Sequence, residues 1–399
     1  MKRPDGFHLL ASLGELDPAQ WDALLHATDS AAPPCLRHAY LHALERAHCV
    51  GGRSGWTPAP ATLWRSGELV AAMPLYLKAH SYGEYVFDWA WAEAYQRHGL
   101  DYYPKWLAAV PFTPIPGTRL LGPDPAARRQ LLEAVLARVR DSGLSSFHLL
   151  FPSAQDAALL ADAGLMMREG VQFHWQNGAA PPRDGNTAGG AARWPDFDAF
   201  LASLNHDKRK KIRQERRRAA AHGLSLRWLD GHTANPAEWD FFHHCYAMTY
   251  ALHRSTPYLG AGFFHTLAAR MPDAVRLVLA EREGSPVAAA FFLCDDEGLY
   301  GRYWGAIEPL PFLHFELCYY QAIEYCIKHD LRRFEGGAQG EHKLSRGLLP
   351  VRTQSAHWIA DPRFRNAVDD YLARERNGIG FYLDELAERS PFRRDLTSA

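Results

Sequence analysis

The sequence predicts an α/β (α+β) fold in which each of two lobes contains both strands and helices. A chain of 399 residues is long enough for two domains that each bury a core. The order strand, loop, helix, strand recurs in both halves without a repeat in the amino-acid sequence, so a duplication would be one of fold only. Residues 177–193 are rich in Gly, Ala and Pro, which is typical of a linker. We therefore expect lobes at 1–176 and 194–399.

The N-terminal half is expected to alternate strands and helices. Two apolar runs flank Ser66-Gly67, a pattern typical of a β-hairpin. Apolar side chains recur with helical spacing between residues 125 and 142. The expected elements are, in order, a hairpin of 61–64 and 68–77, an apolar segment at 107–112, a helix at 125–142, a strand at 146–151, a short helix at 155–163 and a strand at 166–175.

The C-terminal half is expected to open with a helix and to continue with a run of strands. Its last part is expected to be a helical tail. Between them, the expected elements are a strand at 224–229, helices at 236–252 and 260–271, strands at 275–281, 287–294 and 299–307, a helix at 316–330, a short apolar-ended segment at 331–334 and a strand that ends at 355–359.

Charge, cysteines and apolar runs limit the function classes. The net charge of −1 predicts no general affinity for nucleic acid or membranes, so any polyanion site must be local. Six cysteines lack metal-site spacing and are expected to be reduced and mostly buried. His243 and His244 diverge by about 100° on a helix, so no metal site is expected there. No signal peptide is recognisable, and no apolar run approaches the roughly 20 residues of a membrane span, which predicts a cytoplasmic protein.

The segment from Phe334 to Gly347 combines four glycines with ionisable side chains. Glycines such as Gly337 would let the backbone approach a ligand closely. A lysine beside glycines can stabilise a developing oxyanion, and a nearby carboxylate can act as a base or contact a substrate amine. We expect Lys343 to supply the positive charge and Glu335 or Glu341 to contact the amine. The remaining candidates for substrate contacts here are His342 and Arg346, and the alternative is a solvated surface turn.

A strongly basic helix is expected at the start of the C-terminal half. Residues 208–218 contain eight Lys or Arg and one acid, Glu215. Such a surface binds phosphate, as in a nucleotide-linked precursor, a coenzyme or a tRNA acceptor stem. We expect Lys208, Arg209 and Lys211 to take part. The alternative is an ordinary solvated helix face.

The strand expected around residue 303 carries an unusual mixture of glycine, aromatic and charged residues. In a regular strand Arg302 and Trp304 share one face, and Gly301, Tyr303 and Gly305 share the other. Arg302 in an apolar strand is not expected to be buried without a partner. We expect Arg302, Tyr303 and Trp304 to line a substrate cleft, and the alternative for Arg302 is a structural ion pair.

The recurring strand, loop, helix and strand resembles the core of the GNAT acyltransferase fold. Two such lobes in one chain resemble the Fem-type peptidyltransferases and the FemAB-like predicted N-acyltransferases, and the resemblance covers most of the chain. The segments that carry it are 87–95, 109–114, 299–305, 334–347 and 355–358. It implies two tandem GNAT-like lobes, each with a mixed central sheet flanked by helices.

The resemblance also implies an activity. A FemAB-like protein is expected to transfer an acyl or aminoacyl group to an amine by direct attack, without a covalent enzyme intermediate. Lys343 matches the lysine that has the role of oxyanion stabiliser in Fem-type enzymes. The implied donor is an acyl-coenzyme A or an aminoacyl-tRNA, and the implied acceptor is a small-molecule or peptidoglycan-precursor amine. No metal, no DNA and no membrane span is expected, although peripheral membrane contact is compatible with this activity.

Two positions in the N-terminal half are candidates by the same resemblance. Arg119 and Gly122 fall where acetyl-coenzyme A enzymes place their pyrophosphate-binding turn, but Pro123 removes a donor and Asp124 adds a negative charge. Asp88 and Glu93 are candidate substrate contacts, with a purely structural aromatic wall as the alternative. Rival functions are a catalytically silent double-GNAT module that binds a peptidoglycan precursor or nucleotide-linked ligand, and an RNA-binding protein that uses the basic helix.

Overall fold

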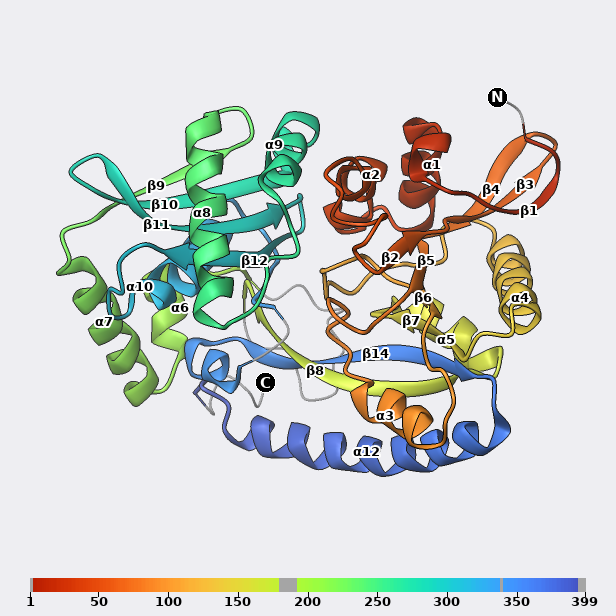
Figure 1. Cartoon of the computed structure of the whole chain (residues 1–399). Coiled ribbons are helices and arrows are strands. Elements are labelled where there is room, and N and C mark those ends of the chain that lie inside the picture. The colour runs from red at the N-terminus through yellow and green to blue at the C-terminus, as the bar shows by residue number, and fades with distance from the viewer. Residues whose placement is uncertain (1–2, 179–191, 338–339, 394–399) are drawn as a thin grey trace. The chain divides into compact units, whose positions relative to one another are not determined.

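The computed structural model describes residues 3–178, 192–337 and 340–393 (Figure 1). The chain forms two compact units. Unit 1 contains residues 1–170, 258–263 and 352–380, and unit 2 contains 171–257, 264–351 and 381–399. The expected linker at 177–193 lies mostly outside the described residues. The expected lobes were continuous in sequence, whereas residues 352–380 group with the N-terminal residues.

Unit 1 is built on two sheets. The first is a three-stranded antiparallel sheet in the order β1-β3-β4. The second contains the strands β2-β5-β6-β7-β14 in this order. Its β6 and β7 are parallel, and its other neighbouring pairs are antiparallel. The strands are β1 (Gly6–Leu9), β2 (Trp56–Pro58), β3 (Ala61–Arg65), β4 (Glu68–Met73), β5 (Leu75–Lys78), β6 (Lys105–Ala108), β7 (Ser146–Leu150) and β14 (Leu349–Ile359).

The helices of unit 1 include three that the sequence pattern did not predict. These are α1 (Pro18–Thr28), α2 (His38–Arg46) and α3 (Trp89–Arg97). The expected helices are confirmed as α4 (Pro125–Asp141) and α5 (Ala154–Asp162), and the tail as α12 (Pro362–Glu388), which runs from unit 1 into unit 2. The strand expected at 68–77 is divided at Pro74, because proline has no N–H to continue the ladder. Its two parts, β4 and β5, join different sheets.

Unit 2 is built on one mixed sheet in the order β8-β13-β12-β11-β10-β9. The pair of β12 and β13 is parallel, and the other pairs are antiparallel. The strands are β8 (Met166–Gln176), β9 (Ser225–Asp230), β10 (Val275–Arg282), β11 (Ser285–Cys294), β12 (Gly298–Ala306) and β13 (Arg333–Glu335). The helices are α6 (Phe197–Ser203), α7 (His206–Ala220), α8 (Pro236–Leu252), α9 (Ala261–Arg270), α10 (Leu313–Phe315) and α11 (Gln321–Lys328).

A strand, a helix and a parallel strand form the centre of each unit, as the sequence predicted. In unit 1 these are β6, α4 and β7, and in unit 2 they are β12, the helical segment 313–328 and β13. In unit 2 the parallel pairing ends at Tyr300, although β12 continues to Ala306. The chain after β13 therefore leaves the sheet next to the last residues of β12. Lys343 lies in the segment that follows β13.

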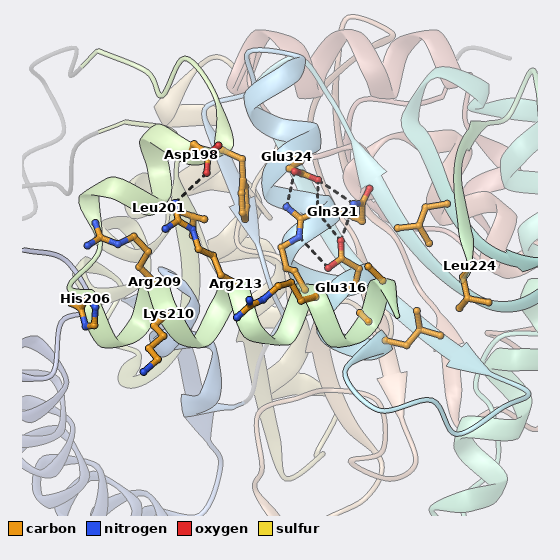
Figure 2. Close-up of a pocket in the computed structure, with 17 residues that line it drawn as sticks. Asp198, Leu201, His206, Arg209, Lys210, Arg213, Leu224, Glu316, Gln321 and Glu324 are labelled. Carbon is orange, nitrogen blue, oxygen red and sulfur yellow. Dashed lines mark hydrogen bonds and ion pairs between the residues drawn. The ribbon is translucent and has the colours of Figure 1, made fainter. Parts of the chain in front are cut away.

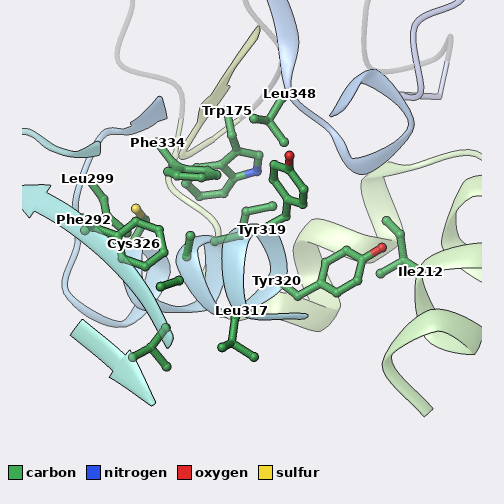
Figure 3. Close-up of a cluster of buried hydrophobic side chains, with 14 of the residues drawn as sticks. Trp175, Ile212, Phe292, Leu299, Leu317, Tyr319, Tyr320, Cys326, Phe334 and Leu348 are labelled. Atoms are coloured by element: carbon green, nitrogen blue, oxygen red, sulfur yellow. The ribbon is translucent and has the colours of Figure 1, made fainter. Parts of the chain in front are cut away.

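The core of unit 2 lies between the sheet and the helical segment 313–328. Glu316–Tyr320 forms a π-helical turn between α10 and α11, and its buried side chains face the core. Figure 3 shows aromatic and aliphatic side chains from the strands and this helix gathered in one cluster, with one contribution from α7. The labelled members include Trp175, Phe292, Leu299, Phe334, Leu317, Tyr320 and Ile212.

On the opposite face of the sheet, α8 crosses β10–β12 (Figure 1). Thr249 on α8 donates a hydrogen bond to the carbonyl of Trp304 on β12 at 3.0 Å. A Cβ atom at Gly305 would lie 2.1 Å from the carbonyl oxygen of Cys245. The close approach of helix and strand therefore requires glycine at this position. In the described part of the chain, no helix has both the length and the apolar character required to cross a bilayer.

Gly305→Ala is expected to lower the free energy of unfolding by about 2–4 kcal/mol, because the new methyl group must displace helix backbone. Urea denaturation measures this change. The matched control is Gly262→Ala in α9, where an added Cβ meets no atom within 4 Å. The control should be neutral or stabilising by up to about 1 kcal/mol. Equal effects of the two changes would contradict the assigned packing of α8 on β12.

Candidate functional site

Lys343 is a buried lysine in the turn that follows β13. It lies in a short 3₁₀ helix, Glu341–Arg346, and is 4% exposed. Its Nζ donates a hydrogen bond to the carbonyl oxygen of Gly337 at 3.0 Å. Gly337 has a φ of +84°, a conformation that favours glycine. The glycines of this segment thus bring a backbone carbonyl to a buried amino group, and residues 338–339 between them lie outside the described residues.

The environment of Lys343 disfavours its charged form. Burial lowers the pKa of the Lys343 amino group to about 8. No carboxylate among the described residues lies within ion-pair distance of its Nζ, and one acceptor is present where the ammonium group has three donors. Because a pKa of about 8 is still above neutral pH, the amino group remains a cation there. It has donors available to an oxygen that develops negative charge.

Glu335 ends β13 and is also buried. One carboxylate oxygen accepts a hydrogen bond from Nε of Arg333 at 3.2 Å. The other, Oε2, has no hydrogen-bond partner in the described part of the chain and lies 3.9 Å from Nε2 of His174. Burial lowers the pKa of His174. A neutral imidazole thus lies beside a carboxylate oxygen that can accept a further hydrogen bond.

His174 was not among the residues predicted from the sequence. It pairs with Glu335 across the antiparallel strands β8 and β13. The sequence indicated only that His174 lies in a packed strand, because its neighbours Phe173 and Trp175 are apolar, and both are buried. The pairing that brings His174 to Glu335 joins strands 161 positions apart in the sequence, so local patterning could not reveal it.

Arg346 has a structural environment that does not fit the predicted substrate contact. Its guanidinium is buried, donates to a carboxylate oxygen of Glu215 at 2.8 Å and donates to the carbonyl of His342 at 2.7 Å. It also stacks 3.6 Å over the ring of Phe315. Glu215 in turn accepts a hydrogen bond from the hydroxyl of Tyr320. Arg346 therefore fastens the Lys343 helix to α7 and to the π-helical turn.

The other two predicted residues of this segment lie at its surface. Glu341 accepts hydrogen bonds from the hydroxyl of Tyr382 at 2.8 Å and from Arg389 at 3.2 Å. His342 lies 3.0 Å from the hydroxyl of Tyr319 through Nε2. Glu341 is thus tied to residues at the end of the chain, whereas Glu335 is the buried acid of the segment. A contact of Glu341 or His342 with substrate remains a prediction.

The face assignment in β12 was wrong, because the strand contains a β-bulge. Phe291 on β11 pairs with Tyr303 and Phe292 pairs with Gly301, which leaves Arg302 as the extra residue. Gly301 and Tyr303 consequently lie on opposite faces. The guanidinium of Arg302 donates to the hydroxyl of Tyr303 at 3.2 Å. Trp304 lies with its ring 4.6 Å from the ring of His314. Substrate contacts of these β12 residues remain predictions.

Helix α7 carries cations on two different faces. Ile212, Glu215 and Ala219 form its buried stripe. One cationic face carries Lys211 and Arg218. Lys211 lies one helical turn before Glu215, which pairs with Arg346, so Lys211 is on the side of the Lys343 segment.

The second face of α7 carries Arg209, which lines a pocket of about 860 Å³. Lys208 is half-buried beside the apolar stripe. The predicted phosphate ligands Lys208, Arg209 and Lys211 therefore do not form a single cluster. Lys211 lies closest to the candidate site, and Arg209 belongs to a separate pocket.

In unit 1, Asp88 belongs to a buried polar network. Its carboxylate pairs with the ammonium group of Lys105 and accepts a hydrogen bond from the hydroxyl of Tyr102 at 2.7 Å. Burial opposes its ionisation, but the charge of Lys105 holds the pKa of Asp88 below its usual range. Glu93 lies instead on the exposed side of α3, 3.8 Å from Arg97. The two acids therefore do not act together, and the exposed one makes an ordinary helix ion pair.

The loop before α4 does not fit the predicted coenzyme contact. Arg119 is fully buried, and its guanidinium donates to the carbonyls of Gly117 at 3.0 Å and Ile115 at 2.8 Å. The N–H of Gly122 donates to the hydroxyl of Thr28 at 2.7 Å. Asp124 caps α4 by accepting a hydrogen bond from the N–H of Ala126. The groups that would hold a pyrophosphate are engaged within the protein.

The described residues contain no cluster of three or more His, Cys, Asp or Glu side chains that could hold a metal ion. The candidate site consists of Lys343 in the turn after β13, Glu335 at the end of β13 and His174 opposite it on β8. Its chemistry is a buried cation, an acceptor carboxylate oxygen and a neutral imidazole.

Comparison with known proteins identifies the family. The profile of the FemAB-like family, described as peptidoglycan biosynthesis/recognition, matches residues 12–394. The match covers nearly the whole chain, and the protein belongs to the FemAB-like family. A comparison with curated proteins finds no match.

Solved structures with a related fold include FemX, at 11% sequence identity and a TM-score of 0.51 over 89% of this chain and 98% of that chain. The C-terminal domain of a putative lysylphosphatidylglycerol synthetase from Agrobacterium fabrum is 12% identical, with a TM-score of 0.50 over 89% of this chain and 97% of that chain. A tandem GNAT protein from the clavulanic acid biosynthesis pathway is 14% identical, with a TM-score of 0.44 over 89% and 98%. At these identities the likeness concerns the fold. The predicted α/β fold class, with a mixed sheet flanked by helices in each of two units, is confirmed.

Arg346→Met is expected to lower the free energy of unfolding by about 3–5 kcal/mol, because it leaves the carboxylate of Glu215 buried without its cation. Chemical denaturation measures the loss. The control is Arg389→Met, which breaks a pair whose two side chains are 50% and 46% exposed. That change should cost less than about 1 kcal/mol. A small effect of Arg346→Met would show that the pair does not hold the segment in place.

Proposed function

We propose that this protein is an N-acyltransferase of Fem-like type, which transfers an acyl or aminoacyl group to an amine. The observation that carries the proposal is Lys343, a buried cation with one acceptor among the described residues. A buried lysine without a carboxylate partner is costly to the fold, and such groups are found where catalysis uses them. The FemAB-like family, described as peptidoglycan biosynthesis/recognition, supports this reaction class.

In the proposed reaction a neutral amine attacks the carbonyl carbon of the donor. The C–N bond forms and the carbonyl oxygen becomes an oxyanion, to which Lys343 donates a hydrogen bond. The nitrogen loses its proton to Oε2 of Glu335 or to the neighbouring His174. The carbonyl then re-forms, and the thiol or alcohol of the donor leaves with a proton. The products are an amide and the free carrier, and catalysis is by positioning and charge stabilisation.

The donor and the acceptor follow the same proposal. Both an acyl-coenzyme A and an aminoacyl-tRNA carry phosphates and an activated carbonyl, and Lys211 and Arg218 on α7 are the cations proposed to meet these phosphates. Arg218 lies 5.3 Å over the ring of Phe312, next to the start of the helical segment 313–328. The proposed acceptor is the amine of a peptidoglycan precursor, in keeping with the family description.

A second candidate function is a binding module without catalysis. The observation that favours it is the loop before α4, where Arg119 and Gly122 are engaged within the protein. A module of this kind would bind a peptidoglycan precursor or nucleotide-linked ligand and release it unchanged. Replacement of Lys343 distinguishes the two functions.

Lys343→Met is expected to lower the rate of acyl transfer by about 10²–10³-fold while ligand binding is retained, because it removes an oxyanion donor. The same change should raise the free energy of unfolding at pH 7 by about 1–3 kcal/mol. The lowered pKa means that protonating Lys343 opposes folding, in full below about pH 8. Single-turnover transfer and urea denaturation measure the two effects. Lys328→Met, an exposed change in the same unit, should alter neither. Full activity of Lys343→Met would refute the proposal.

The pH dependence of transfer provides a separate test. The pKa of Lys343 is about 8, so the oxyanion donor loses its positive charge as the pH rises through that value. We expect the single-turnover rate to decline above about pH 8. In Lys343→Arg the cation persists, because arginine remains protonated to above pH 12, and the decline should disappear even if the maximum rate is lower. The same decline in both proteins would show that another group causes it.

A further inference from the structure

The pocket that Arg209 lines runs along α7 and has a volume of about 860 Å³. This is within the range of small-molecule sites, roughly 300–1,000 Å³. It is formed in unit 2 by α6, α7, β9 and the helical segment 313–328. Figure 2 shows His206, Arg209 and Lys210 at one end of the pocket and Leu224 at the other. The pocket therefore has a charged end and an apolar end.

The charges around this pocket do not cancel. Five Lys or Arg side chains line it against three carboxylates. Arg216 takes two of the acids, since it pairs with Glu316 at 2.8 Å and Glu324 at 2.7 Å. Arg213 lies 3.5 Å from the third, Asp198. The remaining cations, Arg209, Lys210 and Arg217, have no ion-pair partner among the described residues. An anion would find unpaired donors there.

The apolar end provides surface for a hydrocarbon chain. Leu224, Leu226 and Leu313 line it, and Leu224 and Leu226 are only half-buried. Phe197 also lines the pocket, is half-buried and lies under the guanidinium of Arg216. An apolar ligand that covers such surface gains about 25 cal/mol for each Å² removed from water. A small inorganic anion would leave this part of the pocket unused.

The pocket is distinct from the Lys343 site. Successive residues of a helix are about 100° apart, so Arg209 and Arg213 lie roughly 140–180° around α7 from Lys211 and Arg218. Lys211 is one helical turn from Glu215, the partner of Arg346 in the Lys343 segment. One face of α7 therefore lines the pocket, and the other lies toward the Lys343 segment.

We propose that this pocket binds an anionic amphiphile, with its phosphate at Arg209 and Lys210 and its hydrocarbon chain against Leu224 and Leu226. The proposal concerns a separate site and does not depend on acyl transfer. The recognised chemistry is a phosphate ester joined to an alkyl chain. A membrane phospholipid and a free alkyl or acyl phosphate compound share it.

Binding of octyl, dodecyl and hexadecyl phosphate to the full chain, measured by isothermal titration, tests this proposal, because about three helical turns separate Arg209 from the end of α7. The Kd should fall by about two- to fourfold for each added CH₂ group, because a fully buried CH₂ contributes about 0.8 kcal/mol. Arg209→Gln with Lys210→Gln should raise the Kd of octyl phosphate at least tenfold. The matched control is Arg270→Gln with Lys328→Gln, which removes the same charge from two exposed positions of unit 2 outside the pocket and should leave the Kd within twofold. Circular dichroism checks that each variant is folded.

Two outcomes would overturn the proposal. One is inorganic phosphate that binds as tightly as octyl phosphate, and the other is an equal loss of affinity in the two double variants. Leu224→Asp should weaken hexadecyl phosphate more than octyl phosphate, and an unchanged chain-length series in this variant would also contradict the assignment. Vesicles distinguish the source of the ligand. Binding to phosphatidylglycerol vesicles but not phosphatidylcholine vesicles, lost in Arg209→Gln with Lys210→Gln, indicates a membrane lipid. Binding of alkyl phosphates without vesicle binding indicates a free amphiphile.

Discussion

The ion pair between Arg346 and Glu215 is the contact on which the candidate site of unit 2 depends. Glu215 is the one acid among the eight basic residues of 208–218, and it is buried. Through it α7 is joined to the short helix that carries Lys343, and Tyr320 joins the π-helical turn to the same carboxylate. Breaking a buried pair costs more than forming it contributes, because one charge is left without a partner. The position of Lys343 therefore depends on the buried pair of Arg346 and Glu215.

Two of the three buried lysines in the described part of the chain, Lys105 and Lys343, differ in what their surroundings do to their charge. Lys105 in unit 1 is fully buried and pairs with Glu84 and Asp88, and these carboxylates raise its pKa. Lys343 in unit 2 is also buried, but burial lowers its pKa to about 8 and a backbone carbonyl is its acceptor. A lysine that is kept charged by carboxylates stabilises the fold around it. A lysine that lacks them opposes folding and is suited to an anion that forms during a reaction.

The helices, strands and fold class were largely predictable, because apolar periodicity is a local property of the sequence. Interactions between distant residues were not. Arg346 was expected to contact substrate, but its partner Glu215 is 131 positions away. The bulge at Arg302 reverses the expected faces of β12, and only the register with β11 reveals it. Gly337 and Lys343 were recognisable as a site because glycine and ionisable residues occur together in one short segment. The roles of the site residues remain proposals.

The central claim is that Lys343 is a buried cation poised to meet an oxyanion. The most direct test is an NMR titration of the full chain with ¹³C-labelled lysine, in which Lys343→Arg identifies the resonance of Lys343. The account predicts a pKa of about 8 for this amino group, and a rise when a phosphonate analogue of the tetrahedral intermediate binds. A pKa near the ordinary lysine value of about 10.4, unchanged by the analogue, would contradict it.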